Sequence, residues 1–362
     1  MKSLLQTLFI GWVWSRFLAL RIEIAKDTRN HIAGLSMKFI SFLGLLWILA
    51  IVFVLSLCVG DSPIGFEDLW DYVSGTSSSE TTVLVIRDIR LPRTLAALLT
   101  GSALGVSGAM LQGMLRNPLA SPFLLGISSG SGVCVVILFS LNSLAYWIPL
   151  GAWLGAVVSA LIVFCIAYDQ KRISLERLIL SGVAVSSVLG SVQAIFLLRS
   201  DDTRIQNSLT WLSGTLAGRE WGDLTFTWIP IVVCLLCSFV FAKQLNLALL
   251  DDDTSRSLGL SLTRLRILIG VCATLLTSCS VCIAGLVGFV GLVIPHIARL
   301  LCGGNFVYVL PFSGVLGALT VVVGDLIARM YLWELPVGIV TALFGSPFFI
   351  YLLRKRRMEG SV

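Results

Sequence analysis

Three adjacent carboxylates, Asp251, Asp252 and Asp253, are the first side chains in this chain that suggest chemistry. Acidic clusters can hold Mg²⁺ against a diphosphate, as a membrane-embedded prenyl- or phospho-transferase requires. That arrangement needs carboxylates three or four residues apart on one helical face, whereas these three are consecutive and no second cluster accompanies them. Acids also stabilise the start of a helix. We therefore favour a helix N-terminus, predict no metal site and no cofactor, and keep the transferase as an alternative.

The three acids belong to a polar segment, residues 246–266, that lies between two apolar runs. Asp253 or Thr254 can cap a first short helix, which Gly259 can end. Ser261 can cap a second short helix directly afterwards. A pair of helices on one face of a membrane protein is either a docking surface for a partner or an ordinary solvated loop.

Cysteines offer little further chemistry. The chain has nine, and Cys234 with Cys237, and Cys279 with Cys282, have the spacing of redox or zinc pairs. Both pairs lie inside apolar runs without a neighbouring histidine. We interpret them as small buried residues.

A proton-driven secondary carrier would need acids or histidines near the middle of the membrane. Asp325 precedes Arg329 by four residues, which places both on one helical face and predicts a structural ion pair. His296 is one of only two histidines, so a metal site there is not favoured. The chain has no GxxxxGK[ST] phosphate loop, and another chain must therefore bind ATP if ATP is used.

These residues must be positioned by membrane-spanning helices. The composition is 57% hydrophobic and 13% charged, with a mean hydropathy of +0.94. A helix needs roughly 20 apolar residues to cross the hydrocarbon core. Apolar segments occur near residues 39–60, 94–114, 123–140, 146–168, 178–198, 225–242, 265–283, 284–302, 308–329 and 335–353. We predict an all-α polytopic membrane protein with about ten transmembrane helices.

Three regions follow from this pattern: an amphipathic, interfacial N-terminal extension at 1–37, a transmembrane domain at 38–357 and a short tail at 358–362. The positive-inside rule orients the spans with both termini in the cytoplasm, because most of the 26 lysines and arginines then lie inside. The basic residues lie at span ends rather than in an aromatic-interleaved patch, so no nucleic-acid partner is expected. The basic residues that fall outside are Arg87, Arg90, Arg93, Arg199, Arg204, Arg219 and Arg329.

Several longer motifs carry a family resemblance. They are RLPR at 90–93, RNPLA at 116–120, LGISSG at 125–130, WLSG at 211–214, GFVGLVIPHIAR at 288–299, DLIAR at 325–329 and ELPVG at 334–338. In this order they resemble the permease subunits of ABC importers for ferric siderophores, haem and cobalamin, the FecCD-type family. The resemblance runs from about residue 39 to residue 357.

This resemblance implies the ABC importer permease fold of the bacterial cytoplasmic (inner) membrane. It implies a second permease subunit, identical or homologous, two ATP-binding cassette ATPases and an extracytoplasmic substrate-binding protein. The chain itself would be a transporter subunit and not an enzyme, because ATP hydrolysis would reside in the partner chains. The expected substrate is an iron complex, foremost a ferric siderophore, with haem or cobalamin as alternatives.

The resemblance also assigns roles to residues. In the family, the segment between spans six and seven docks into the ATPase. The positions that match it here are Leu250, Asp251, Asp252, Asp253, Thr254, Ser255, Arg256, Ser257, Leu258, Gly259 and Leu260. Arg90, Arg93 and Arg329 match arginines that meet acidic groups of the binding protein, although Arg90 and Arg93 could instead be simple span-end anchors.

The inner gate of the family corresponds to Leu175 and Glu176, although Glu176 could instead be a helix N-terminal acid. Ser186, Gly190 and Gln193 would line the substrate path in the fifth span. Small and hydroxyl residues also allow helices to pack closely, so the path and packing interpretations both stay open.

Overall fold

The structure of the chain is a computed structural model that describes residues 36–60, 64–76, 79–141, 147–169, 172–331 and 335–359. The chain divides into two compact units, Met1–Trp47 and Ile48–Val362. The described part of the first unit is the beginning of one helix, and the packing and the sites described below lie in the second unit. Most of the predicted extension at 1–37 and residues 360–362 of the predicted tail at 358–362 lie outside the described residues, so these boundaries stay predictions.

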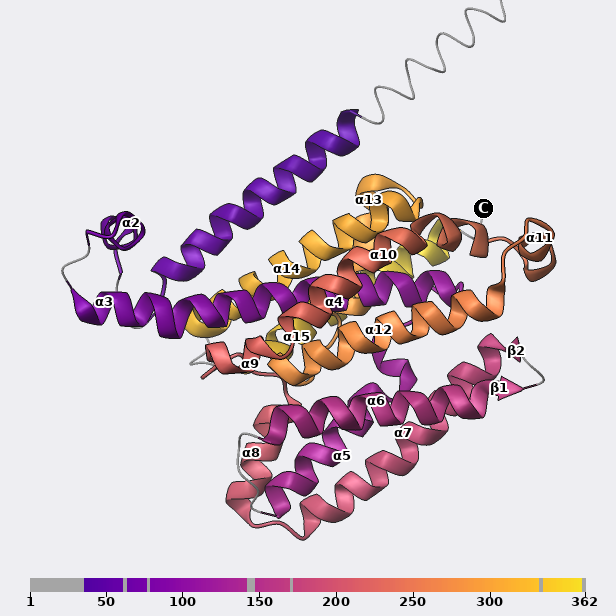
Figure 1. Cartoon of the computed structure of the whole chain (residues 1–362), viewed down its shortest axis with the longest axis horizontal. Helices are drawn as coiled ribbons and strands as arrows, with labels where there is room; N and C mark the ends of the chain where they lie inside the picture. Colours follow the sequence, from indigo (N-terminus) through magenta and orange to yellow (C-terminus); the bar gives the residue numbers. More distant parts are fainter. Residues whose placement is uncertain are drawn as a thin grey trace, which may run out of the picture. The chain divides into compact units, whose positions relative to one another are not determined.

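The described residues are almost all helical (Figure 1). The first helix is Ser36–Cys58. The others are α2 (Phe66–Ser74), α3 (Glu80–Leu84), the π-helical turn η1 (Val85–Arg90), α4 (Leu91–Met114), the 3-10 turn η2 (Pro122–Leu125), α5 (Ile127–Ser140), α6 (Trp147–Ala167), α7 (Leu175–Leu198), α8 (Asp202–Leu212), α9 (Trp221–Thr225), α10 (Trp228–Ala248), α11 (Asp252–Ser257), α12 (Leu262–Ala284), α13 (Val290–Cys302), α14 (Phe306–Tyr331) and α15 (Val337–Glu359). Two short strands, β1 (Tyr168–Asp169) and β2 (Arg172–Ile173), form an antiparallel pair.

The predicted number of apolar helices is confirmed. Among the described residues, seven helices are long and apolar enough to cross a membrane, and three shorter apolar helices accompany them. Each of the ten predicted segments overlaps with one of these helices. The chain is therefore an all-α polytopic membrane protein.

Helix α4 is the centre of the packing, with α10, α12, α13 and α14 around it (Figure 1). Close approach of the backbones makes this possible. A Cβ atom added to Gly101 would lie 2.1 Å from the carbonyl oxygen of Gly317, and one added to Gly108 would lie 1.9 Å from that of Gly291. Small residues hold helices together in lipid, where burial of apolar surface gives little drive for association.

A second group of helices, α5, α6 and α7, pack against one another, and α6 contacts α12 of the first group (Figure 1). The β1–β2 hairpin joins α6 to α7, with Tyr168 paired to Ile173 and Asp169 paired to Arg172. This hairpin was not predicted from the sequence. Its second strand ends at Ile173, and α7 begins two residues later at Leu175.

Two predicted spans are shorter in the structure than in the sequence analysis. The segment predicted at 284–302 forms a helix only from Val290 to Cys302, because residues 285–289 are not helical. The segment predicted at 123–140 begins with the separate turn η2, and its helix starts at Ile127.

Candidate functional site

The polar segment at 246–266 forms one short helix, α11, directly before the long helix α12. Asp251 caps α11, because its carboxylate accepts a hydrogen bond of 3.0 Å from the backbone N–H of Thr254. That hydrogen bond holds the pKa of the Asp251 carboxyl below its ordinary value. The prediction that Asp253 or Thr254 caps this helix is therefore wrong, because the cap is Asp251, two residues before Asp253. The second helix is also not short, since α12 continues from Leu262 to Ala284.

The end of α11 and its attachment to α10 are well defined. Gly259 has a φ of +84°, a left-handed conformation that glycine adopts at little cost, and its N–H donates to the Arg256 carbonyl. The buried hydroxyl of Ser255 donates a 2.9 Å hydrogen bond to the carbonyl of Leu247 at the end of α10. The predicted end of the helix at Gly259 is confirmed.

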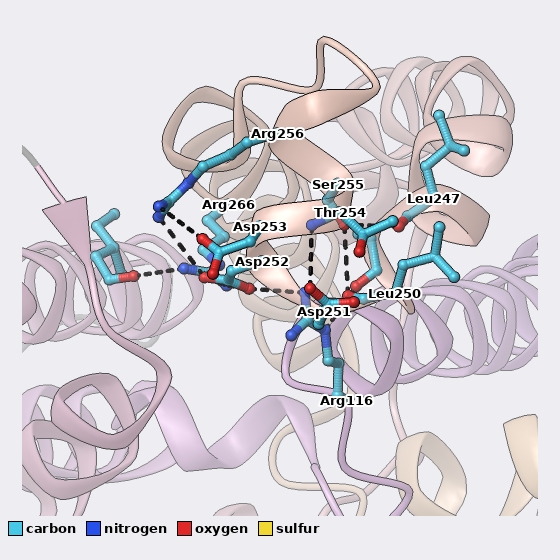
Figure 2. A network of polar contacts seen from close by, with 12 residues as sticks. Arg116, Leu247, Leu250, Asp251, Asp252, Asp253, Thr254, Ser255, Arg256 and Arg266 are labelled. Atoms are coloured by element: carbon cyan, nitrogen blue, oxygen red, sulfur yellow. Dashed lines mark hydrogen bonds and ion pairs between the residues drawn. The ribbon is translucent and has the colours of Figure 1, made fainter.

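Asp252 is the central residue of an arginine network that the sequence analysis missed (Figure 2). Its carboxylate lies 2.7 Å from Nη2 of Arg116 and accepts hydrogen bonds of 3.0 and 3.1 Å from Nη2 of Arg266. Arg256 is more distant, with Nη2 at 3.8 Å. Partial burial raises the pKa of the Asp252 carboxyl, but Arg266 and Arg116 lower it by more, so the net pKa lies below its ordinary value. Asp252 is thus charged at neutral pH and held between cations.

The three aspartates do not form a shared cation site. Asp251 caps a helix, Asp252 pairs with arginines, and the side chain of Asp253 is 95% exposed. Among the described ranges, no group of three or more His, Cys, Asp or Glu side chains could hold a metal ion. Arginines around a carboxylate oppose Mg²⁺ binding, so the geometry speaks against the transferase alternative.

A second polar cluster lies where α4 and α14 meet the end of the first helix. Asp325, which is 1% exposed, accepts a 3.0 Å hydrogen bond from Nε of Arg93 and lies 3.1 Å from Nε of Arg329. The predicted pair of Asp325 with Arg329 is therefore confirmed, and Arg93 joins it. Because two arginines neutralise Asp325, this acid is poorly suited to carry protons, which disfavours the secondary-carrier alternative.

The three outer arginines, which were expected to meet a binding protein or, for Arg90 and Arg93, to anchor the end of a span, are largely buried in the structure. Arg90 is 4% exposed and Arg93 is 9% exposed. Nη1 of Arg90 donates to the carbonyls of Leu57 and Cys58 at 2.7 and 2.6 Å. Nη2 of Arg329 donates to the Ser56 hydroxyl at 2.6 Å. In this structure Arg90 and Arg329 donate to the last carbonyls of the first helix, whose partial negative charge favours cations, whereas Arg93 pairs with Asp325.

The predicted gate residues lie at the start of α7. The Ser174 hydroxyl caps this helix by accepting a 3.1 Å hydrogen bond from the N–H of Arg177. Leu175 is half-buried, and Glu176 is exposed in the first turn, where an acid stabilises the helix N-terminus. Both interpretations of Glu176 are compatible with this position.

The three predicted path residues of α7 have different environments. Ser186 is partly exposed, and Gly190 is exposed with no atom within 4 Å of an added Cβ atom. The side-chain oxygen of Gln193 would lie 2.6 Å from a Cβ atom on Gly132, so Gln193 packs against α5. A row of large apolar side chains is exposed along the same helix: Leu180, Val183, Val188, Ile195 and Leu198.

Comparison with known proteins identifies the class. The chain belongs to the FecCD transport family, which matches residues 48–355. It is an ABC importer permease of the FecCD type and a multi-pass protein of the inner membrane. Its similarity to a solved structure of a metal-chelate type ABC transporter in an inward-facing conformation has a TM-score of 0.79 at 31% identity, over 87% of this chain and 98% of the other.

The chain is similar in sequence to relatives that are named for different substrates. The chain is 40% identical to the Fe(3+)-citrate import system permease protein YfmD of Bacillus subtilis, over 84% of this chain and 91% of the relative. It is 38% identical to the cobalamin import system permease protein BtuC of Halobacterium salinarum, over 78% of this chain and 76% of the relative. Relatives named for such different substrates are almost equally similar, so identity alone does not fix the substrate.

Proposed function

We propose that the chain translocates an iron complex, foremost a ferric siderophore, across the inner membrane, with haem and cobalamin as the alternatives. Two partner ATPases would hydrolyse the ATP, a second permease subunit would complete the path, and a binding protein would deliver the substrate. The family membership and the iron-citrate and metal-chelate relatives support this proposal.

The proposed ATPase-docking surface is the segment from Leu250 to Leu260, and its exposed leucines are the observation that carries the proposal. Leu250 and Leu258 are 42% and 57% exposed on a segment outside the apolar helices, and neighbouring Leu249 is 47% exposed. Apolar side chains clustered on a projecting polar segment indicate a protein contact. Exposed leucines would not stabilise a loop that contacts only water. The charge bias predicts that this surface is cytoplasmic.

The proposed contact with the second permease subunit is the exposed face of α7. Its large apolar side chains alternate with small residues such as Ser187 and Gly190, which would let a second helix approach closely. Substrate would pass along this interface, with Leu175 and Glu176 at its inner end as gate residues.

For the binding protein, we propose that Arg90, Arg93 and Arg329 act indirectly. They would hold the end of the first helix and thereby shape the surface that the binding protein meets. Arg87, three residues before Arg90, has a side chain that is 68% exposed.

The proposed function is tested by purifying the chain with its genomic neighbours and measuring ATPase activity in lipid. Binding protein loaded with ferric siderophore, ferric citrate, haem or cobalamin is added in parallel, with unloaded binding protein as the control. Stimulation by one loaded form would establish the class and the ligand. A chain that associates with no ATPase would contradict the proposal.

Gly259→Ala should weaken ATPase association and lower ATP-driven uptake severalfold, while membrane insertion stays normal. An alanine at the φ of +84° of Gly259 costs about 1–2 kcal/mol, although no neighbouring atom lies within 4 Å of the new Cβ atom. The helix end would shift to relieve that strain. Co-purification of the ATPase and uptake measure the effect.

Gly303→Ala is the matched control for Gly259→Ala. Gly303 has a φ of +83° and equally open surroundings, but it follows α13 outside the docking segment. The same strain there should leave ATPase association intact. Equal behaviour of the two variants would show that backbone strain alone, and not docking, explains the result.

A further inference from the structure

We propose that Arg266 is a positioning residue that links the docking helix α11 to the start of α7, where the gate residues lie. This inference rests on the proposed function, because it takes α11 as the surface on which the ATPase acts. It adds a specific route by which movement of α11 reaches the gate.

Arg266 bonds two separate elements at once (Figure 2). Its Nη2 donates to both carboxylate oxygens of Asp252 in α11, at 3.0 and 3.1 Å. Its Nη1 donates to the backbone carbonyl of Ile173 in β2, at 2.8 Å. Arg266 is only 8% exposed, so water competes weakly for these bonds. The guanidinium therefore fixes the distance between α11 and β2.

The hairpin passes this constraint on to α7. Ile173 is immediately followed by Ser174, whose hydroxyl caps α7, and then by Leu175 and Glu176. On the other strand, Asp169 forms an ion pair with Arg177 in the first turn of α7. The hairpin is thus attached to the start of α7 by the chain itself, by a helix cap and by an ion pair. Displacement of β2 must move the start of α7 or break these contacts.

The chemistry of the position requires arginine. A guanidinium presents several N–H groups in a rigid planar fork and can bond two acceptors in different directions. A lysine ammonium at the same place could keep its attraction to Asp252 but has no rigid fork to reach the Ile173 carbonyl as well. Lysine should therefore preserve the charge balance and lose the link.

Arg116 anchors the opposite side of the same carboxylate. Its Nε donates a 2.6 Å hydrogen bond to the carbonyl of Ala248 at the end of α10, and its Nη2 lies 2.7 Å from Asp252. Asp252 consequently stays connected to the helix bundle when Arg266 is changed. Loss of Arg266 should detach the hairpin from α11 without releasing α11.

The test compares Arg266→Gln and Arg266→Lys with wild type in the complete transporter, reconstituted in proteoliposomes with ATPases and loaded binding protein. Uptake and ATP hydrolysis are measured together, so that substrate transported per ATP is obtained. Arg264→Gln is the matched control, because Arg264 is exposed on the same helix, two residues away.

We expect the ATPases to co-purify with both Arg266 variants and to hydrolyse ATP, while transport per ATP falls about tenfold, within the range of coupling between two sites. Arg264→Gln should keep the wild-type ratio. If the glutamine variant accumulates poorly, because it leaves Asp252 with fewer cations, the lysine variant gives the answer alone.

Two results would overturn the inference. One is a wild-type ratio of transport to ATP hydrolysis in both Arg266 variants. The other is a parallel loss of both activities in well-assembled complexes, which a merely structural role would produce. A wild-type complex without ATP-driven uptake would instead refute the proposed function, and this inference with it.

Discussion

Replacing Asp325 by asparagine should destabilise the folded chain by about 3–5 kcal/mol, the cost of leaving buried charge without its partner. Asp325 is 1% exposed and pairs with both Arg93 and Arg329, at 2.9 and 3.1 Å. Asparagine keeps the shape of the side chain and removes only its charge. Thermal unfolding in detergent or nanodiscs measures the loss.

Two variants serve as comparisons for Asp325→Asn. Asp88→Asn should be close to neutral, because the Asp88 side chain is 52% exposed and lies 3.9 Å from Arg87. Arg93→Gln should lower the free energy of unfolding by less than Asp325→Asn does. It leaves Asp325 paired with Arg329, and this remaining pair carries no net charge. A melting temperature for Asp325→Asn equal to that of Asp88→Asn would contradict the buried network.

Gly108→Ala should destabilise the helix bundle by about 3 kcal/mol, the upper end of the usual cost of overpacking, or prevent accumulation of the chain. The new Cβ atom would lie 1.9 Å from the carbonyl oxygen and 2.7 Å from the Cα atom of Gly291. Both are backbone atoms, so no side chain can rotate away. Helices α4 and α13 would have to separate.

Gly222→Ala in α9 is the matched control for Gly108→Ala, because no atom lies within 4 Å of a Cβ atom added there. It should accumulate and unfold like wild type. Normal accumulation and melting of Gly108→Ala would show that α4 and α13 are not in direct backbone contact.

The apolar helices were predictable from hydropathy, because helices in lipid carry long apolar runs. The ends of these helices were less predictable. Leu286, Val287 and Phe289 are apolar but not helical, so hydropathy placed the predicted span at 284–302 several residues too early. The break at 285–289 depends on backbone conformation, which an apolar composition does not reveal.

The candidate site was predictable in part. Asp325 and Arg329 are four residues apart, and helical spacing alone paired them correctly. The cap of α11 was ambiguous because three consecutive acids can each cap a helix, and only the hydrogen bond from Thr254 identifies Asp251.

Contacts between distant segments could not be predicted. Arg116 lies in the RNPLA motif, and Arg266 lies in the apolar run at 265–283 that follows the docking segment. No local pattern indicates that both bind Asp252. The outer arginines were expected to meet the binding protein because the family resemblance assigns them that contact. Here, Asp325 and the carbonyls at the end of the first helix satisfy them inside the protein.

The chain is an ABC importer permease of the FecCD type, and we propose that it carries an iron complex. The most direct measurement is uptake of radiolabelled ferric siderophore into proteoliposomes that contain the chain and its partner ATPases, with binding protein outside and ATP inside. We expect uptake that requires ATP, the ATPases and the binding protein together. Uptake that proceeds without ATP, or that a proton gradient alone drives, would contradict it.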